Sequence, residues 1–453
     1  MTEAFLQYVW QHKMLEGELK TADGQPVAVV RPGDLNTNAG PDFFDARLRI
    51  GEMCWAGNVE VHIKASDWNL HGHSSDRKYN NVVLHVVYTH DADIVLENGK
   101  TVPTLQISSN IPDDIWDAYN KMMNPDIPLE IACMPRLREI PDFIFEGYED
   151  RLAAERLERK ACDVQRLLDD SRGSWETTCY WVTARYFGGK LNGFAFELLA
   201  KLTPMRYLAK IKDSPFRVEA MMMGQAGLLE GTFHDEYPRQ LQKEYGYMRG
   251  AYNLSPMAGH LWKFFRLRPA SFPTLRISQL ADLVGHSSNL FSHLLEATDL
   301  KQLHRLFSVC ASDYWQTHYN FDHEGDGGPR KAGTAFADTL IINAWAPLLF
   351  QYGVQHDNVR IKERAVDILR QLPPENNRIT RFWGRGFKPA NAAQSQALIQ
   401  LYNEYCSKRQ CLHCRIGYQL LGGNARRIRR MQEQAQQHQH QAAHQQSEEN
   451  NKD

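Results

Sequence analysis

The stretch from Asn38 to Asp91 decides the fold of the first part of the chain: NAGPDFFDARLRIGEMCWAGNVEVHIKASDWNLHGHSSDRKYNNVVLHVVYTHD. Residues 43–50 alternate between apolar and polar side chains, and residues 53–63 form a second strand-like run after Gly51-Glu52. Residues 81–88 form a strong third apolar run. Two strand-like runs joined by two turn residues are typical of a β-hairpin. The sequence therefore predicts a hairpin followed by a third strand.

The residues on either side extend this stretch into a small α/β domain. Before it, apolar side chains recur at helical spacing between residues 2 and 16, and residues 26–31 form a strand-like run. After it, short strand-like runs follow at 94–97 and 102–107. The sequence predicts a first domain over residues 1–125, in which a helix precedes a small mixed sheet.

The second part of the chain has a helical pattern. Residues 149–169 combine strong helix formers with one apolar face, and similar periodicity recurs up to about residue 405. We therefore expect a large all-α domain over residues 126–427. Residues 428–453 are rich in Gln and His and contain no aromatic residue, which is typical of a disordered tail.

Composition limits the class of protein. The 453 residues are 43% hydrophobic and 23% charged, and the net charge is −2, so no global basic field attracts nucleic acid. No apolar run approaches the roughly 18 residues that span a bilayer, and the N-terminus lacks a signal-peptide pattern. We expect a cytoplasmic protein without membrane contact, whose eight cysteines are thiols or metal ligands rather than disulfides.

The hairpin can be given a register from its turn. With Gly51-Glu52 as the two turn residues, Asp42 lies opposite Val61. A glycine inside a strand often marks a bulge, and a one-residue bulge at Gly57 moves the partner of Asp42 to His62. The predicted register therefore places Asp42 opposite His62.

This register collects ionisable side chains on one face of the hairpin. Because side chains alternate along a strand, Glu60, His62 and Lys64 share the face next to Asp42. Two carboxylates on adjacent strands are hard ligands for Mg²⁺ or Mn²⁺. With His62 or Lys64 to orient a water or steady a phosphate, the set suits metal-assisted phosphodiester hydrolysis.

Pro41-Asp42 and the later Glu60-Val61-His62 resemble the PD-(D/E)XK motif of restriction-endonuclease-like nucleases. The resemblance implies that fold for the first domain and a metal-dependent nuclease activity, with DNA favoured as the partner. It also implies that Glu16, at the end of the predicted first helix, is an additional acid. The chain departs from the motif because His62 stands where the lysine usually is, and Lys64 is the residue that could replace it.

The chain also resembles, over nearly its full length, an uncharacterised bacterial family that carries a domain-of-unknown-function label. The resemblance implies no established activity. The segments that carry it are Gly40 to Phe43, Asn58 to His62, Ser66-Asp67-Trp68 with His71, Met223 to Gly227, Arg268 to Arg276, and Cys406 to Gly417.

Two alternative functions remain open. His71 and His73, with Asp76 or His85, could bind Zn²⁺ or another transition metal, because histidines with one carboxylate are typical of metal-dependent hydrolases. The other alternative is a non-catalytic module that keeps the fold and binds nucleic acid or a protein. The sequence identifies no protein partner.

Three cysteines lie close together near the end of the chain, with the spacing Cys406-x₄-Cys411-x₂-Cys414. A tetrahedral Zn²⁺ site or an iron–sulfur cluster needs a fourth ligand. Cys133, in a loop-like segment after the predicted sheet, is the best candidate, and His413 is the local alternative. The sequence does not decide between zinc and an iron–sulfur cluster.

Basic and aromatic residues alternate in WKFFRLRPASFPTLR, residues 262–276. Lys263, Arg266, Arg268 and Arg276 beside aromatic rings suit phosphate contact and base stacking, so this segment is a candidate nucleic-acid-binding patch. The alternative is an amphipathic helix whose aromatic rings fill a core, and we favour it because aromatic residues in helical proteins mostly do so.

Overall fold

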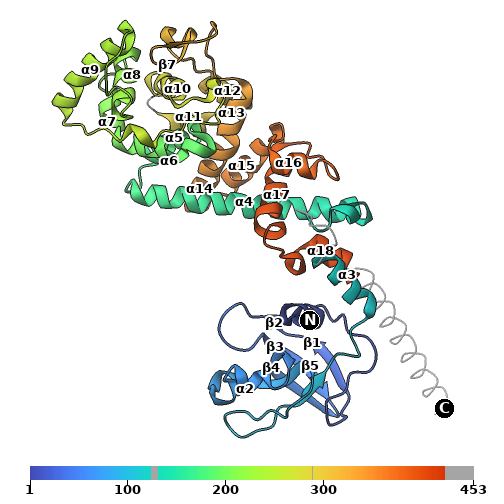
Figure 1. The fold of residues 1–453 in the computed structure, drawn as a ribbon. Helices are drawn as coiled ribbons and strands as arrows, with labels where there is room; N and C mark the ends of the chain where they lie inside the picture. The colour runs from blue at the N-terminus through green and yellow to red at the C-terminus, as the bar shows by residue number, and fades with distance from the viewer. Residues whose placement is uncertain (124–130, 288, 424–453) are drawn as a thin grey trace, which may run out of the picture. The chain divides into compact units, whose positions relative to one another are not determined.

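The computed structural model describes residues 1–123, 131–287 and 289–423, which form two compact units (Figure 1). The first unit joins Met1–Tyr148 to the chain from Leu401 onward, and the second is Glu149–Gln400. The sequence-based division instead placed the C-terminal cysteine segment in the helical domain. The predicted tail, 428–453, lies outside the described residues.

The first unit contains one mixed sheet with the strand order β1-β3-β4-β5-β6, and β2 pairs with β3. β1, β3 and β4 run antiparallel, whereas β5 lies parallel to β4 and β6 parallel to β5. This confirms the small mixed sheet near the N-terminus. Its strands are β1 (Val27–Arg31), β2 (Asp34–Leu35), β3 (Phe43–Ile50), β4 (Met53–Lys64), β5 (Val82–Thr89) and β6 (Thr104–Gln106).

Helix α1 (Glu3–Gln11) covers one face of this sheet. Its apolar residues, among them Phe5 and Val9, form a common core with Val59 and Val61 of β4. The Thr2 side chain caps the helix by accepting a hydrogen bond from the Phe5 amide. The helix ends earlier than the predicted residue 16, and Lys13 just beyond it has a positive φ of 52°.

The predicted register of the hairpin is wrong at its open end. Ile50 pairs with Met53, so Gly51-Glu52 is the turn, but the extra residue lies in β3 rather than at Gly57. The chain bulges between Phe43 and Ala46, where Asp45 has a φ of 51°. Phe43 therefore pairs with Val59, and Asp42 lies next to Glu60 instead of His62.

Gly57 is required for a different reason. A Cβ atom at Gly57 would lie 2.4 Å from Val83 Cγ1 and 2.6 Å from the Asn81 carbonyl oxygen. These atoms belong to β5 and the residue just before it. Gly57 thus allows β4 and β5 to approach each other closely.

Apart from α1 and the short helices between β4 and β5, the helices described in the first unit lie in two segments far apart in the sequence. α3 (Asp113–Met123) and the start of α4 (Asp142–Asp170) follow the sheet, and α4 continues into the second unit. A π-helical turn (Leu401–Cys406) and α18 (Arg415–Leu420) come from the end of the chain. Leu421 is buried in the same core as α1 and the sheet.

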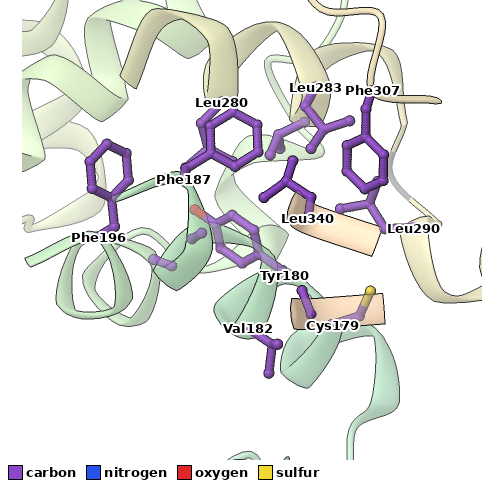
Figure 2. Close-up of a cluster of buried hydrophobic side chains, with 14 of the residues drawn as sticks. Cys179, Tyr180, Val182, Phe187, Phe196, Leu280, Leu283, Leu290, Phe307 and Leu340 are labelled. Atoms are coloured by element: carbon purple, nitrogen blue, oxygen red, sulfur yellow. The ribbon is translucent and has the colours of Figure 1, made fainter. Parts of the chain in front are cut away.

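The second unit is helical, as the sequence predicts, apart from one short hairpin, β7 (His318–Asn320) and β8 (His323–Glu324). Figure 2 shows its core, where side chains from several helices, such as Tyr180, Leu280 and Leu340, pack together. None of the described helices is long and apolar enough to cross a membrane. The helices are α5 (Trp175–Phe187), α6 (Gly189–Leu202), α7 (Met205–Leu208), α8 (Pro215–Gln225), α9 (Glu236–Tyr252), α10 (Pro273–His286), α11 (Leu290–Glu296), α12 (Leu300–Leu306), α13 (Thr334–Leu340), α14 (Ala346–Gln355), α15 (Val359–Gln371), α16 (Arg378–Trp383) and α17 (Ala392–Gln400).

Candidate metal centre

The connection between β4 and β5 brings His71 and His73 next to His62 of β4. Parallel strands cannot be joined by a tight turn, so residues 65–81 form a connection that begins with α2 (Asp67–Leu70), which lies beside β4 (Figure 1). His71 ends this helix and His73 begins a 3₁₀ turn. Gly72 between them has a φ of 77°, a conformation that suits glycine and allows this sharp change of direction.

The side chains of Glu60, His62, His71 and His73 converge there. His62 Nε2 lies 3.1 Å from His71 Nδ1. Glu60 Oε1 lies 3.3 Å from His73 Nε2 and 3.6 Å from His62 Nε2. One ligand atom from each histidine lies within 4.8 Å of the others. The three nitrogens could therefore hold a single ion, and Glu60 Oε1 lies beside two of these histidines.

Asp42 and Glu60 fix each other through the backbone. The Asp42 amide donates to Glu60 Oε2 at 3.0 Å, and the Val61 amide donates to Asp42 Oδ2 at 2.9 Å. Glu60 Oε1 is the oxygen that faces the histidines. Burial raises the pKa of both carboxyl groups, and the proximity of Asp42 raises the pKa of Glu60 further.

A second layer holds the histidine rings. His62 Nδ1 lies 2.9 Å from Nε2 of His85, which is completely buried on β5. The His73 ring stacks on Tyr79 with a centroid distance of 3.9 Å. The Trp68 ring packs edge-on against His62, His73 and His85. Such contacts set the orientation of an imidazole before a metal binds.

The environment favours uncharged imidazoles. Burial, reinforced by His71 and His73, lowers the pKa of His62 to about 3. Burial also lowers the pKa of His73 and His85. Neutral imidazole is the form that binds a metal. The donor set is therefore richer in nitrogen than the two-carboxylate site that the sequence predicts, and it suits transition metals better than Mg²⁺.

Two residues of the predicted catalytic set lie elsewhere. Lys64 is exposed, and its charge acts on Asp91. Glu16 is exposed in the loop after α1, where its backbone bonds to Asn110. The α1 carboxylate near the site is instead Glu3, whose pKa is raised by burial and also depends on His71, Asp42 and Asp67. No sequence signal distinguished Glu3, because its position depends on how α1 packs.

The structure contains only part of the histidine site that the sequence offers as an alternative. His71 and His73 meet His62, whereas His85 lies behind His62 and Asp76 caps a short helix by accepting from the Lys78 amide. The signal that could have indicated this arrangement is the pair of strong strands around residues 65–81. A parallel pairing of these strands requires a crossover, and a crossover passes over the face of a sheet.

The predicted basic patch is only partly on the surface. Lys263, Arg266 and Arg268 are exposed, as is Phe265, which is 81% accessible. Arg276 instead lies 3.7 Å from the Phe336 ring centroid and donates to Gln279 Oε1, so it is part of the packing of the second unit. The four predicted cysteine ligands, Cys133, Cys406, Cys411 and Cys414, line a separate cavity in the first unit.

Comparison with known proteins gives a family. Residues 3–378 match the model of a family described as "Protein of unknown function (DUF2851)". No curated protein and no solved structure gave a match. The matched range includes the candidate metal centre and Cys133 and ends before the three C-terminal cysteines.

Proposed function

The chain belongs to this family of proteins of unknown function, and we propose that it is a metal-dependent hydrolase that cleaves phosphodiester bonds of nucleic acid. The observation that carries the proposal is the convergence of His62, His71 and His73, with Glu60 against two of them and the half-buried Asp42 next to Glu60. Glu60 and His62 are buried, His73 is half-buried and His71 is exposed. Metal-binding groups that fix one another in this way are typical of a catalytic centre.

The phosphodiester as substrate is supported by the order of the elements. Helix α1 precedes the strands, Asp42 comes just before β3, and Glu60 lies on β4. These are the positions on which the PD-(D/E)XK resemblance rests. DNA remains the favoured nucleic acid on the same ground.

Each residue has a separate role in this proposal. Glu60 and the three histidines hold the ion, which would supply a Lewis acid that activates water and stabilises charge on a phosphoryl oxygen. Asp42, anchored by the Val61 amide, keeps Glu60 in place through its own amide and adds negative charge beside the ion. His85 orients His62. Glu3 adds a carboxylate at the edge of the site.

The metal is expected to differ from that of a carboxylate-only site. Imidazole ligands suit Zn²⁺ and similar ions, and Mn²⁺ accepts both oxygen and nitrogen ligands, whereas Mg²⁺ prefers oxygen. We therefore expect Mn²⁺ or Zn²⁺ to bind more tightly than Mg²⁺. This expectation differs from the sequence-based prediction, in which Asp42 and Glu60 are the ligands of Mg²⁺ or Mn²⁺.

A second candidate is a hydrolase that uses the same ion on another ester or amide. The three histidines favour it, because histidine-rich sites with one carboxylate serve several hydrolytic reactions. The substrate distinguishes the two candidates. A protein that binds the metal and cleaves a simple ester but neither DNA nor RNA would support the second one.

The test measures metal binding and cleavage in the full chain. Metal-stripped protein is titrated calorimetrically with Mn²⁺, Zn²⁺ and Mg²⁺, and cleavage is followed on labelled single- and double-stranded DNA and RNA. Glu60→Gln keeps an oxygen that accepts from the Asp42 amide but removes the charge. We expect it to weaken metal binding at least ~100-fold and to abolish cleavage, since losing even a supporting group costs about 10–100-fold.

The matched control is Glu97→Gln, an exchange in the same unit on a glutamate that bonds to Arg77 and Asn80. It should leave binding and cleavage unchanged. Metal binding and nuclease activity that survive in Glu60→Gln would contradict the proposal. Metal binding without cleavage of any nucleic acid would support the metal centre but contradict the proposed nuclease activity.

A further inference from the structure

Four cysteines from two distant segments meet in the first unit. Cys133 precedes a 3₁₀ helix (Met134–Glu139), and Cys406 ends the π-helical turn. Cys411 and Cys414 come just before α18, with Cys414 at its N-cap. All four line one cavity of about 20 Å³, which Met122, Ala132, Tyr405 and Gly417 complete. All eight cysteines of the chain are described, and none forms a disulfide. The cavity is therefore surrounded by free thiols.

Cys414 is buried, the other three cysteines are half-buried, and the four are close enough to influence one another. Burial raises the pKa of Cys411 to about 11 and of Cys133 to about 12, and Cys414 contributes to both shifts. Burial likewise raises the pKa of Cys406, and the other three cysteines raise it further. Thiolates in such a place need positive charge, which a metal supplies.

His413, the alternative fourth ligand, is not part of this set. Its side chain is exposed and its charge acts on His12, and it does not line the cavity. The ligands available are thus the four cysteines alone. This is the donor set of both structural zinc sites and cubane iron–sulfur clusters.

The spacing of the sulfur atoms separates these two possibilities. A Zn–S bond of about 2.3 Å in a tetrahedron puts the sulfur atoms about 3.8 Å apart. Within the described residues, only His62, His71 and His73 bring three ligand atoms within 4.8 Å of one another. No three of the cysteine sulfurs are therefore as close as a single zinc ion requires. A cubane core, with its own sulfides between the irons, holds the thiolates further apart.

We propose that Cys133, Cys406, Cys411 and Cys414 bind a [4Fe–4S] cluster. The cluster joins the segment after the sheet to the C-terminal segment within the first unit. Its ligands are separate from Glu60 and the histidines, so this site does not depend on the hydrolytic function.

The surroundings of the cavity are suited to such a cluster. The Tyr148 side chain is 2% exposed, and its hydroxyl lies beside the Cys414 sulfur. A cluster-bound thiolate would accept a hydrogen bond from this hydroxyl. Gly417 allows the ligand loop to close, since a Cβ there would lie 2.0 Å from the Cys411 carbonyl oxygen.

The proposal is tested on the full chain purified without oxygen. The measurements are iron and acid-labile sulfide per chain, visible absorbance, and the electron paramagnetic resonance spectrum after reduction. We expect about four iron and four sulfide atoms per chain. Zinc without sulfide would overturn the proposal, as would a protein that stays colourless after reconstitution with ferrous iron and sulfide. Both results come from the unmodified protein, so they do not depend on the folding of a variant.

Substitutions then identify the ligands. Cys411→Ser and Cys133→Ser should each lose most of the iron and sulfide, whereas Cys54→Ser, which changes an exposed strand cysteine of the same unit, should keep both. Full cluster content in Cys133→Ser would overturn the four-cysteine site. Cleavage assays with Glu60→Gln report on the other site, so the failure of one proposal is distinguishable from the failure of the other.

Discussion

At the scale of single residues, the candidate metal centre depends on how its members hold one another. Glu60 uses one oxygen for the Asp42 amide and directs the other at His62 and His73. His62 in turn is held by His85 from behind. Groups fixed in this way lose little freedom when they bind an ion, which is the physical advantage of a preorganised site.

A residue of the second unit gives a pH-dependent prediction. Lys160 on α4 is 8% exposed, and it donates to Asn343 Oδ1. Burial, reinforced by Arg156, lowers its pKa to about 7, although Glu375 acts in the opposite direction. In the unfolded chain the pKa is about 10.4, so between these values the unfolded state binds more protons. The contribution of Lys160 therefore makes the free energy of unfolding rise with pH, by up to about 1.4 kcal/mol per unit.

The measurement compares denaturant unfolding of the protein and of Lys160→Met between about pH 7 and about pH 9. Relative to the variant, the protein should gain stability across this range by roughly 1–2 kcal/mol, because the variant lacks the titrating group. Lys190→Met, an exposed lysine on α6, should follow the protein at every pH. Parallel curves for the protein and Lys160→Met would show that Lys160 keeps an ordinary pKa.

Several residues of the candidate metal centre share one short stretch of sequence. Strand alternation, which needs no tertiary information, places Glu60 and His62 on one face, whereas the position of Asp42 next to Glu60 depends on the bulge in β3. The proximity of Glu3 could not be predicted in this way, since it depends on the packing of α1 on the sheet. The exclusion of Lys64 has a similar cause: it lies at the end of β4, where its side chain reaches solvent.

At the scale of elements, the β3–β4 hairpin shows that the sequence pattern does not determine where a bulge lies. Its strands and turn could be predicted, but the bulge could lie in either strand. Gly57 was the plausible position, yet the extra residue is in β3, where Asp45 adopts a left-handed conformation. Glycine is required at position 57 because strand β5 lies so close to it. The parallel pairing of β4 and β5 depends on the crossover and cannot be read from local sequence.

This role of Gly57 is testable. Gly57→Ala should destabilise the first unit by about 1–3 kcal/mol, because the methyl group would overlap Val83 and the Asn81 carbonyl and force β4 and β5 apart. Metal affinity should fall as well, since β4 carries Glu60 and His62. Denaturant unfolding and calorimetric titration measure the two effects.

A second substitution tests whether the stability lost in Gly57→Ala can be recovered, and another serves as a control. Adding Val83→Ala should restore only part of the loss, because the Asn81 carbonyl remains 2.6 Å from the new Cβ. Ala56→Ser, on an exposed position of the same strand, should change neither stability nor metal affinity. A Gly57→Ala protein as stable as the original would mean that the two strands are less closely packed than described.

At the scale of the whole molecule, the first unit is discontinuous in sequence. Residues before Glu149 and residues from Leu401 onward share one core, with the whole second unit inserted between them. Helical periodicity alone assigned the C-terminal segment to the helical domain, since a pattern of apolar residues does not reveal which core they enter. The contacts that decide it are tertiary: Leu421 is 2% exposed, the Tyr418 ring lies 4.7 Å from that of His12, and Arg136 donates to the Leu420 carbonyl.

This arrangement predicts that a substitution near the end of the chain weakens its beginning. Leu421→Ala removes a buried side chain from the core of the first unit and should cost about 2–5 kcal/mol there. Hydrogen exchange should then report faster exchange in α1 and in strands β3 to β5, with the helices of the second unit unchanged. Leu294→Ala, at a fully buried position of α11, should produce the reverse pattern. If Leu421→Ala accelerated exchange only in residues 401–423, the C-terminal segment would be an appendage of the first unit and not part of its core.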